Sequence, residues 1–184
     1  MVENSLGRLW LEGHPDDSLK SNWRYYLDEA PQEPEVEAQL AEIRKEYAKL
    51  EPEDLKCIDP CMGSGHILVY MFDVLMQIYV SVGYSEREAA KSILEHNLYG
   101  LDIDDRAYQL AYFAVMMKAR KHNRRILSSG IKPHVYAIEE SNSVDKETVK
   151  YFCNGDEKLE AALDTILAEL EDAKEYGSIL NVTP

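Results

Sequence analysis

The segment from residue 55 to residue 82 constrains the fold most strongly, because three consecutive patterns in it belong to different kinds of local structure. Residues 55–58 form a short apolar run, residues 59–65 read DPCMGSG, and a long apolar stretch occupies about 66–82. A short apolar run bounded by turn residues is typical of a buried strand, and a longer one is typical of a helix. The segment therefore predicts a strand, a glycine turn and a buried helix.

Later segments continue this alternation. Ser85 and Glu88 form a capping box, which starts a helix that should end near Asn97. Further strands are expected at residues 98–103 and 134–138, with a helix from Asp105 to about His122 between them. A last amphipathic helix, ending near Gly177, is expected to carry Leu159, Leu163, Ile166, Leu167 and Leu170. This order predicts an α/β fold with a parallel sheet and crossover connections.

The region before this pattern, residues 1–54, is predicted to be an N-terminal helical segment, and residues 55–184 form the second domain. Glu3 to Leu11 has helical spacing near the start of the chain. Pro34 opens another helix, whose apolar stripe comprises Val36, Leu40, Ile43, Tyr47 and Leu50. A coiled-coil seam would have this pattern, but two heptads are too few to establish one. Packing against the same chain is therefore the favoured interpretation.

The charge of the chain limits what it can bind. The formal net charge at pH 7 is −14, and neutralising the phosphates of a nucleic acid requires clustered Lys and Arg. We therefore do not expect this segment to be a free-standing nucleic-acid binder. One basic cluster falls where a helix is expected to end, and cations there favour the helix dipole. It comprises Lys118, Arg120, Lys121, Arg124 and Arg125.

Cysteine usage and the apolar segments indicate a cytoplasmic protein that does not span a membrane. Cys57, Cys61 and Cys153 contain no C-x-x-C pair, so neither a disulfide framework nor a zinc site is indicated. The most apolar run, residues 67–82, is interrupted by two polar residues and is shorter than the roughly 20 residues of a membrane span. No signal peptide is expected at the start of the sequence.

Two acidic residues and two glycines predict a site for a nucleoside cofactor. Asp59 begins the glycine turn after the first expected strand, and Asp102 stands at the end of the second. Gly63 and Gly65 allow the backbone to approach a ligand closely. A carboxylate at the second strand end can accept hydrogen bonds from both hydroxyls of a ribose. Asp59 alone could merely cap the turn, and its pairing with Asp102 is what favours cofactor binding.

The details of the turn argue against a dinucleotide or a nucleoside triphosphate. A dinucleotide fingerprint has a third glycine where this chain has Leu68, and its acid follows about 20 residues on, whereas Asp102 follows Gly65 by 37 residues. Asp59 would repel a pyrophosphate but would complement the sulfonium and ammonium groups of S-adenosylmethionine. No Gly-Lys-Ser or Gly-Lys-Thr follows the glycines, which excludes a P-loop. S-adenosylmethionine is therefore the expected cofactor.

At these residues the sequence resembles the adenine-specific (N6) DNA methyltransferases of restriction-modification and phage-exclusion systems, especially the large PglX-like enzymes of the BREX type. The likeness rests on DPCMGSG at 59–65 and GLDID at 100–104, and it is strongest from Cys57 to about Arg120. It implies a Rossmann-like, S-adenosylmethionine-dependent methyltransferase fold with additional helices. Only the first three parallel strands of that fold would be represented, with the Asp59 strand innermost.

The resemblance also implies roles for single residues. Asp102 would hold the ribose, and Ile103 would pack on the adenine. A polar residue after the third strand would meet the adenine amino group, and Glu139, Glu140 and Asn142 are the candidates. The residues that would line the methionine part of the cofactor are Asp59, Pro60, Cys61, Gly63, Ser64 and Gly65.

More weakly, two further stretches resemble parts of the same enzymes. Residues 4–8 (NSLGR) are similar to the lead-in before the cofactor loop. Residues 172–180 (DAKEYGSIL) are similar to the stretch that precedes the catalytic motif.

The chain departs from the family where catalysis would occur. Such enzymes hold the target adenine with Asn-Pro-Pro-Tyr or a close relative, and this sequence contains no two adjacent prolines. No catalytic residue is therefore assigned, and the 184 residues are interpreted as the S-adenosylmethionine-binding portion of a longer parent enzyme that contacts DNA. RNA, a protein or a small molecule remains open as the acceptor. A non-catalytic interaction module with a vestigial cofactor loop is a further alternative.

A sheet of only three strands would leave the Asp59 strand with an unpaired, apolar edge. Such edges pair with other chains unless they are covered. We expect the chain either to self-associate through this edge or to cover it with its N-terminal or C-terminal helix.

Overall fold

Three short parallel strands form the sheet of this computed structural model. They are β1 (Cys57–Asp59), β2 (Leu98–Asp102) and β3 (His134–Ala137), in the order β1-β2-β3. The register places Asp59 beside Gly100 and Asp102 beside Ala137. Because the strands are parallel, their carboxyl ends lie at one end of the sheet, where open α/β folds bind ligands. The predicted partial Rossmann-like arrangement of three parallel strands is confirmed.

The structure describes residues 1–177 and residue 180, apart from the side chain of Lys174, and the chain divides into two compact units. Met1–Ala137 contains the sheet, and Ile138–Pro184 is the second unit. The helices before residue 55 belong to the sheet unit. In the part of the chain that the structure describes, no helix is long and apolar enough to cross a membrane.

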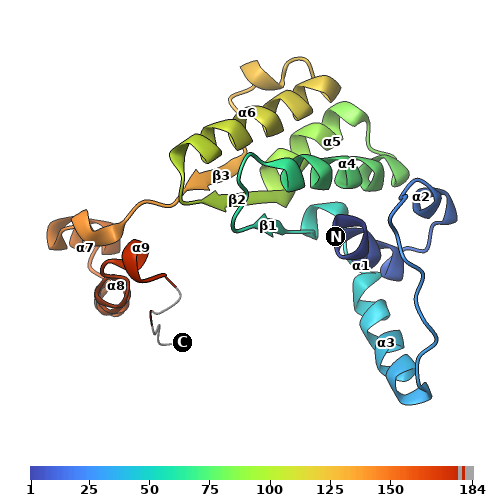
Figure 1. Cartoon of the computed structure of the whole chain (residues 1–184), viewed down its shortest axis with the longest axis horizontal. Coiled ribbons are helices and arrows are strands. Elements are labelled where there is room, and N and C mark those ends of the chain that lie inside the picture. The colour runs from blue at the N-terminus through green and yellow to red at the C-terminus, as the bar shows by residue number, and fades with distance from the viewer. Residues whose placement is uncertain (178–179, 181–184) are drawn as a thin grey trace. The chain divides into compact units, whose positions relative to one another are not determined.

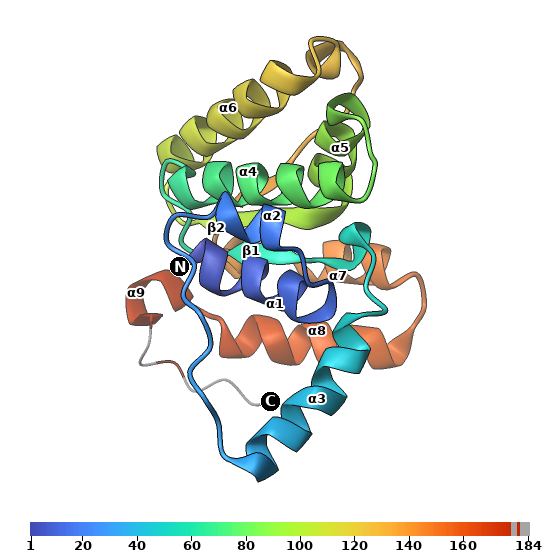
Figure 2. The same ribbon diagram turned by 90° about the vertical axis from the view of Figure 1, so that its right-hand side faces the viewer.

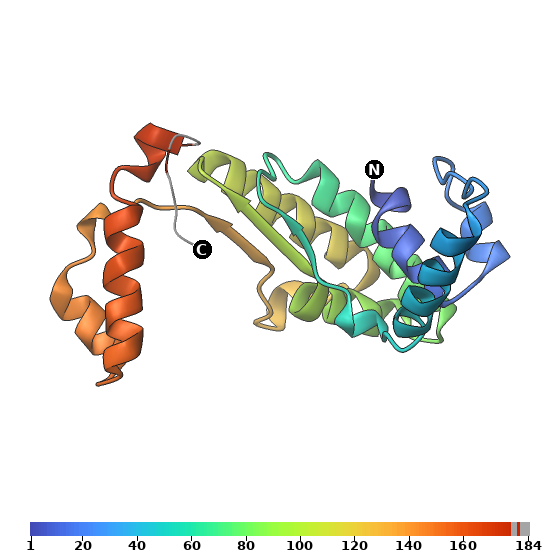
Figure 3. The same ribbon diagram turned by 90° about the horizontal axis from the view of Figure 1, so that it is seen from below.

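One face of the sheet is covered by α4 (His66–Ser81), α5 (Glu86–Ser92) and α6 (Asp105–His122), as Figure 1 shows. Right-handed crossovers that step in one direction across a sheet place their helices on the same face, which explains this arrangement. Figure 3 shows the strands from the other side, in front of α4 and α6. Ile58 and Tyr136 are more than half exposed. The fully buried side chains of α4 are Leu68, Phe72, Val74, Leu75, Ile78 and Tyr79.

A buried polar network joins the start of β2 to the segment that leads into β1. Asn97 ends a π-helical turn (Ile93–Asn97), and its amide nitrogen donates to the carbonyls of Pro52 and Leu55 at 2.6 and 2.8 Å. The Tyr79 hydroxyl donates to the Asn97 side-chain oxygen at 2.9 Å and lies 3.0 Å from the Ser92 hydroxyl. These bonds satisfy polar groups that would otherwise be buried without partners, and they fix how β1 and β2 begin.

The chain before β1 forms a 3₁₀ turn (Val2–Asn4), α1 (Leu6–Gly13), α2 (Asp17–Ser21) and α3 (Pro34–Tyr47). Glu3 is buried and ties the N-terminus to the sheet unit, because it accepts hydrogen bonds from the Tyr25 backbone and the Tyr70 hydroxyl. Further short 3₁₀ turns lie at Pro52–Asp54, Ile126–Ser128 and Ser141–Ser143.

Helix α3 extends away from the sheet in Figures 1 and 2. Val36 and Ile43 of its apolar stripe are 41% and 43% exposed. The expectation that the stripe packs against the same chain is therefore wrong for these two side chains. A helix can satisfy its backbone internally, so its pattern predicts the helix without specifying what covers the apolar face.

The second unit contains α7 (Lys146–Cys153), α8 (Glu157–Glu169) and α9 (Ala173–Tyr176). Asp145 and Asp156 cap the first two of these helices by accepting backbone N–H groups. The sequence predicted α8 but not α7. The stretch at 172–180 that resembles a pre-catalytic segment is only partly covered, because residues 178 and 179 lie outside the described residues.

Candidate cofactor site

Asp59 ends β1 and is the most buried of the acidic residues expected at the site, with 8% of its surface exposed. Its Oδ1 accepts the Cys61 backbone N–H at 3.2 Å. Its Oδ2 is buried and has no hydrogen-bond partner among the described residues. A buried carboxylate oxygen without a partner is costly, and a donor or a cation from a ligand would relieve that cost.

The loop after Asp59 is held tightly against the second strand. The Met62 backbone N–H donates to the Leu101 carbonyl at 2.9 Å, and the Gly65 N–H donates to the Met62 carbonyl at 2.9 Å. Gly65 has a φ of +82°, which favours glycine, and a Cβ there would lie 3.0 Å from Ala111 of α6. Glycine at this position therefore allows both the turn and the close packing of α4 on α6.

Asp102 connects the end of β2 to the same loop. Its Oδ2 accepts the Gly63 backbone N–H at 2.8 Å, and its Oδ1 accepts the Asp104 N–H at 3.0 Å. The bond from Asp104, followed by the bond from Gly63, lowers the pKa of the Asp102 carboxyl below its usual value. Asp102 is therefore a carboxylate at neutral pH, with lone pairs left for further donors.

The structure brings most of the expected loop residues to one end of the sheet. Asp59 accepts the Cys61 N–H of the loop there, and Asp102 accepts the Gly63 N–H of the same loop. Pro60, Cys61 and Ser64 are exposed on the loop, and Ile103 follows Asp102 with 65% of its surface exposed. An exposed apolar side chain beside two acids suits the flat face of an adenine ring.

The three candidates for the adenine amino contact belong to the second unit. Glu139, Glu140 and Asn142 have exposed side chains. The Asn142 amide donates to Asp172 at 2.8 Å and its oxygen accepts the Asp172 N–H at 3.1 Å, so this side chain is already engaged within its own unit.

Sequence reasoning missed Met62, which occupies a variable position of the loop pattern. Met62 is 4% exposed and anchors the loop by packing over Gly100 of β2. A Cβ at Gly100 would lie 2.6 Å from the Met62 sulfur and 2.7 Å from Leu68 Cδ1. An apolar residue inside an otherwise polar glycine loop was the signal that could have indicated this anchor.

The carboxylate acceptors at this end of the sheet fit S-adenosylmethionine. The buried Oδ2 of Asp59, which has no partner among the described residues, can accept from, or pair with, a positively charged group. Among the described residues nothing lies within 4 Å of the position of a Cβ at Gly63, so the loop is open there. Asp102 supplies the acceptor expected for ribose hydroxyls. The charges of both carboxylates disfavour a pyrophosphate at the same place.

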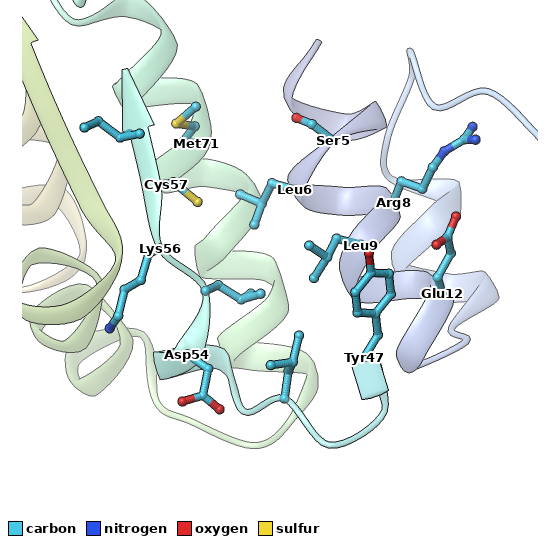
Figure 4. A pocket seen from close by; sticks show the side chains of 13 residues that line it. Ser5, Leu6, Arg8, Leu9, Glu12, Tyr47, Asp54, Lys56, Cys57 and Met71 are labelled. Carbon is cyan, nitrogen blue, oxygen red and sulfur yellow. The ribbon is translucent and has the colours of Figure 1, made fainter. Parts of the chain in front are cut away.

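A separate groove of about 610 Å³ runs between α1 and the free edge of β1. Figure 4 shows Leu6 and Leu9 on the α1 side and Cys57 and Met71 on the β1 side, with Tyr47 next to Leu9. Across residues 1–177, β1 pairs with β2 alone. The N-terminal helix therefore stands beside the edge without forming a strand ladder with it.

A parallel sheet with a glycine loop and two acids at its carboxyl end defines an α/β domain of the Rossmann-like class. The profile of the N-6 DNA methylase family matches residues 35–164, which is more than half of the sequence. The chain therefore belongs to the N-6 DNA methylase family. This membership implies the use of S-adenosylmethionine.

Two curated relatives are similar over most of the chain. The adenine-specific methyltransferase BrxX of Escherichia coli O9:H4 (strain HS) is 49% identical over 141 residues, which cover 77% of this chain and 12% of that protein. The adenine-specific methyltransferase PglX of Lacticaseibacillus casei (strain Zhang) is 42% identical over 189 aligned positions, which cover 98% of this chain and 15% of that protein. The chain thus spans less than one sixth of the length of these relatives.

Proposed function

We propose that this chain carries the S-adenosylmethionine-binding portion of a DNA adenine-N6 methyltransferase from a restriction-modification or phage-defence system. The observation that carries the proposal is that two acids, Asp59 and Asp102, each accept a backbone N–H of the same loop. Asp59 has a buried oxygen that finds no partner in the described part of the chain, and Asp102 bonds to Gly63 of the same loop. Family membership supports the same conclusion, and so does the fact that both relatives are adenine-specific methyltransferases.

The residues of the chain would divide the work of holding the cofactor. Asp59 would accept from its positively charged groups, while Pro60, Cys61, Ser64 and the two glycines of the loop line the same part. Asp102 would accept the ribose hydroxyls, and Ile103 would pack on the adenine. Glu139 or Asn142 would bond to the adenine amino group. When bound, S-adenosylmethionine supplies a methyl group activated by its sulfonium.

The acceptor in this proposal is the N6 amino group of adenine in DNA, and the longer protein contacts that DNA. The net charge of −14 disfavours this segment as the main DNA contact. Because the sequence has no Asn-Pro-Pro-Tyr motif, we expect the 184 residues alone to transfer no methyl group. The free thiols of Cys57, Cys61 and Cys153 agree with a reducing, cytoplasmic location.

Titration calorimetry with S-adenosylmethionine tests the proposal. We expect heat with the wild-type chain and at least a tenfold weaker interaction for Asp59→Asn and for Asp102→Ala. Asp164→Asn removes an exposed acid of α8 and should bind like the wild type. No heat with any variant, or equal heat with all of them, would contradict the proposal and favour a vestigial loop.

We further propose that the free edge of β1 and its groove accept an added strand. In the longer protein another segment would supply it, and in the isolated chain self-association would occur at the same edge. Unpaired strand edges attract such pairing, and the apolar walls of the groove would bury the side chains of the added strand.

Light scattering on the 184-residue chain tests this edge. An edge lysine discourages strand pairing, so Ile58→Lys should reduce association. Tyr136→Lys is the matched control, because Tyr136 is similarly exposed on the same sheet but on β3. A monodisperse wild-type monomer, or equal association of both variants, would count against the edge.

A further inference from the structure

Helix α3 is attached to the sheet unit mainly at its C-terminal end. A Cβ at Gly13 of α1 would lie 2.5 Å from the Tyr47 carbonyl, so α1 touches the α3 backbone there. Arg44 pairs with Glu29 of the preceding loop at 2.5 Å and with Glu37 at 2.9 Å. None of the residues of α3 is buried. The helix therefore presents most of its surface to solvent.

The apolar residues of α3 have the spacing of an interface rather than that of a buried core helix. Successive members of the stripe are four, three, four and three residues apart, which places them at alternating d and a positions of a heptad. Val36 and Ile43 are exposed and Leu40 is only half-buried. Leu50, at the far end of the stripe, packs against the core of its own chain. From Val36 to Ile43 the stripe is uncovered and matches the contact surface between two paired helices.

The charges along α3 favour one particular pairing. Glu33, Glu35 and Glu37 lie at its N-terminal end, whereas at its C-terminal end the charges of Arg44 and Lys45 are balanced by Glu42 and Glu46. A parallel copy would set the two acidic ends side by side, and an antiparallel copy sets each acidic end beside an end that is close to neutral. The helix dipoles favour the same arrangement, because opposite ends of antiparallel helices are adjacent.

We propose that α3 is a self-association surface, on which α3 of a second copy lies antiparallel about a two-fold axis. Leu40 then packs against Ile43 of the second copy, and Val36 packs against Tyr47. Glu37 and Arg44 occupy e positions, so each faces the other across the interface. A pairing of one short helix from each copy buries less than a standard stable interface, so the association is concentration-dependent.

Other occupants fit these observations less well. A nucleic acid requires clustered cations, and the N-terminal half of α3 carries acids. Helices that lie on membrane surfaces are rich in Lys and Arg beside their apolar face, which α3 is not. The surface is independent of cofactor binding, so it can be tested whether or not the proposed function holds.

Charge reversal provides the test, with association measured by sedimentation equilibrium. Glu37→Arg alone places two cations opposite each other, and Arg44→Glu alone places two acids opposite each other. We expect each variant by itself to associate at least tenfold more weakly than the wild type. An equimolar mixture of the two variants restores both attractive pairs and should associate like the wild type.

A control and a second background make the outcome specific. Glu42→Arg introduces the same charge change at a c position, off the stripe, and should leave association unchanged. Circular dichroism checks that each variant is folded. Repeating the series in Ile58→Lys removes any contribution of the β1 edge.

A monomeric wild type, association that no α3 reversal alters, or a mixture that fails to recover would overturn the proposal. The second of these results would assign self-association to another surface, and a helix from elsewhere in the longer protein would then be the candidate partner of α3.

Discussion

The loop at residues 59–65 and helix α3 were both predicted from strong local sequence patterns. They differ in how closely other elements of the chain pack against them. In the loop, contacts from other elements fix each turn, since Met62 bonds to Leu101, Gly63 bonds to Asp102 and Gly65 packs on Ala111. In α3, the pattern produces a helix whose apolar residues remain exposed.

A local sequence pattern therefore determines which secondary-structure element forms, whereas contacts with other elements determine how firmly each residue is held in place. Substitutions in or behind the loop should therefore be severe, and substitutions on α3 should be mild. Experiments that measure substitutions in the two regions side by side test this expectation.

The largest effect is expected behind the loop, at Gly100. A side chain there would collide with Met62, Leu68 and Val135, all within 3.0 Å of its Cβ. We expect Gly100→Val to lower the free energy of unfolding by about 3 kcal/mol or to prevent folding, because overpacking a buried site forces backbone shifts. Urea denaturation measures it. Gly130→Val provides the comparison, since a Cβ there meets nothing within 4 Å and only its backbone conformation is strained. A Gly100→Val chain about as stable as the wild type would show that packing at Gly100 is loose.

Asn97 should give the next largest effect on stability. Replacing it with Leu leaves the buried Leu55 carbonyl without its side-chain donor and removes one of two bonds from the Pro52 carbonyl. The Tyr79 hydroxyl loses its acceptor and keeps only the Ser92 hydroxyl. We expect a loss of about 2 to 3 kcal/mol, given about 1 to 3 kcal/mol for a buried unsatisfied group. Tyr79→Phe removes only one member of the network and should cost less. Thermal unfolding compares them, and an Asn97→Leu chain as stable as the wild type would contradict the network.

The contacts around Gly100 and Asn97 also show what the sequence alone could not predict. The strand, turn and helix at 55–82 and the helix starting at Asp105 were predictable, because each has a local period and a terminating signal. The anchoring roles of Met62 and Asn97 were not, because they depend on partners 39 and 42 residues away, Leu101 and Leu55 respectively.

For the candidate site, the residue types could be predicted from the sequence, whereas their contacts with the loop came from the structure. Asp59 and Asp102 could be chosen from the loop pattern and the strand ends. That one Asp59 oxygen is buried without a partner, and that Asp102 bonds to Gly63, required the strand register. Helix α7 was not predicted because its few apolar residues, including Val149 and Cys153, span too short a segment to show a helical period.

Thiol labelling compares a largely buried cysteine with an exposed one. Burial raises the pKa of the Cys57 thiol to about 11, whereas Cys61 is exposed on the loop. Because alkylation requires the thiolate, which forms only as pH approaches the pKa, Cys57 should stay almost unreactive at pH 8 and react more as pH rises. The shift from 9.0 to about 11 corresponds to about a hundredfold less thiolate. Mass spectrometry after iodoacetamide treatment should show Cys61 modified first, and S-adenosylmethionine should slow that modification. Faster labelling of Cys57 would contradict its burial.

The smallest effect on stability is expected on α3 itself. Ile43→Ala should change the free energy of unfolding by less than about 0.5 kcal/mol when measured at a concentration where the chain is monomeric, because Ile43 is 43% exposed. Leu75→Ala on α4 is the matched truncation of a fully buried side chain and should cost about 2 to 5 kcal/mol. Urea denaturation at low and high chain concentrations sharpens the contrast further. If α3 pairs with a second copy, the cost of Ile43→Ala grows with concentration, because the paired state buries Ile43, while the cost of Leu75→Ala does not. A large loss for Ile43→Ala in the monomer would instead mean that the stripe is already covered by its own chain.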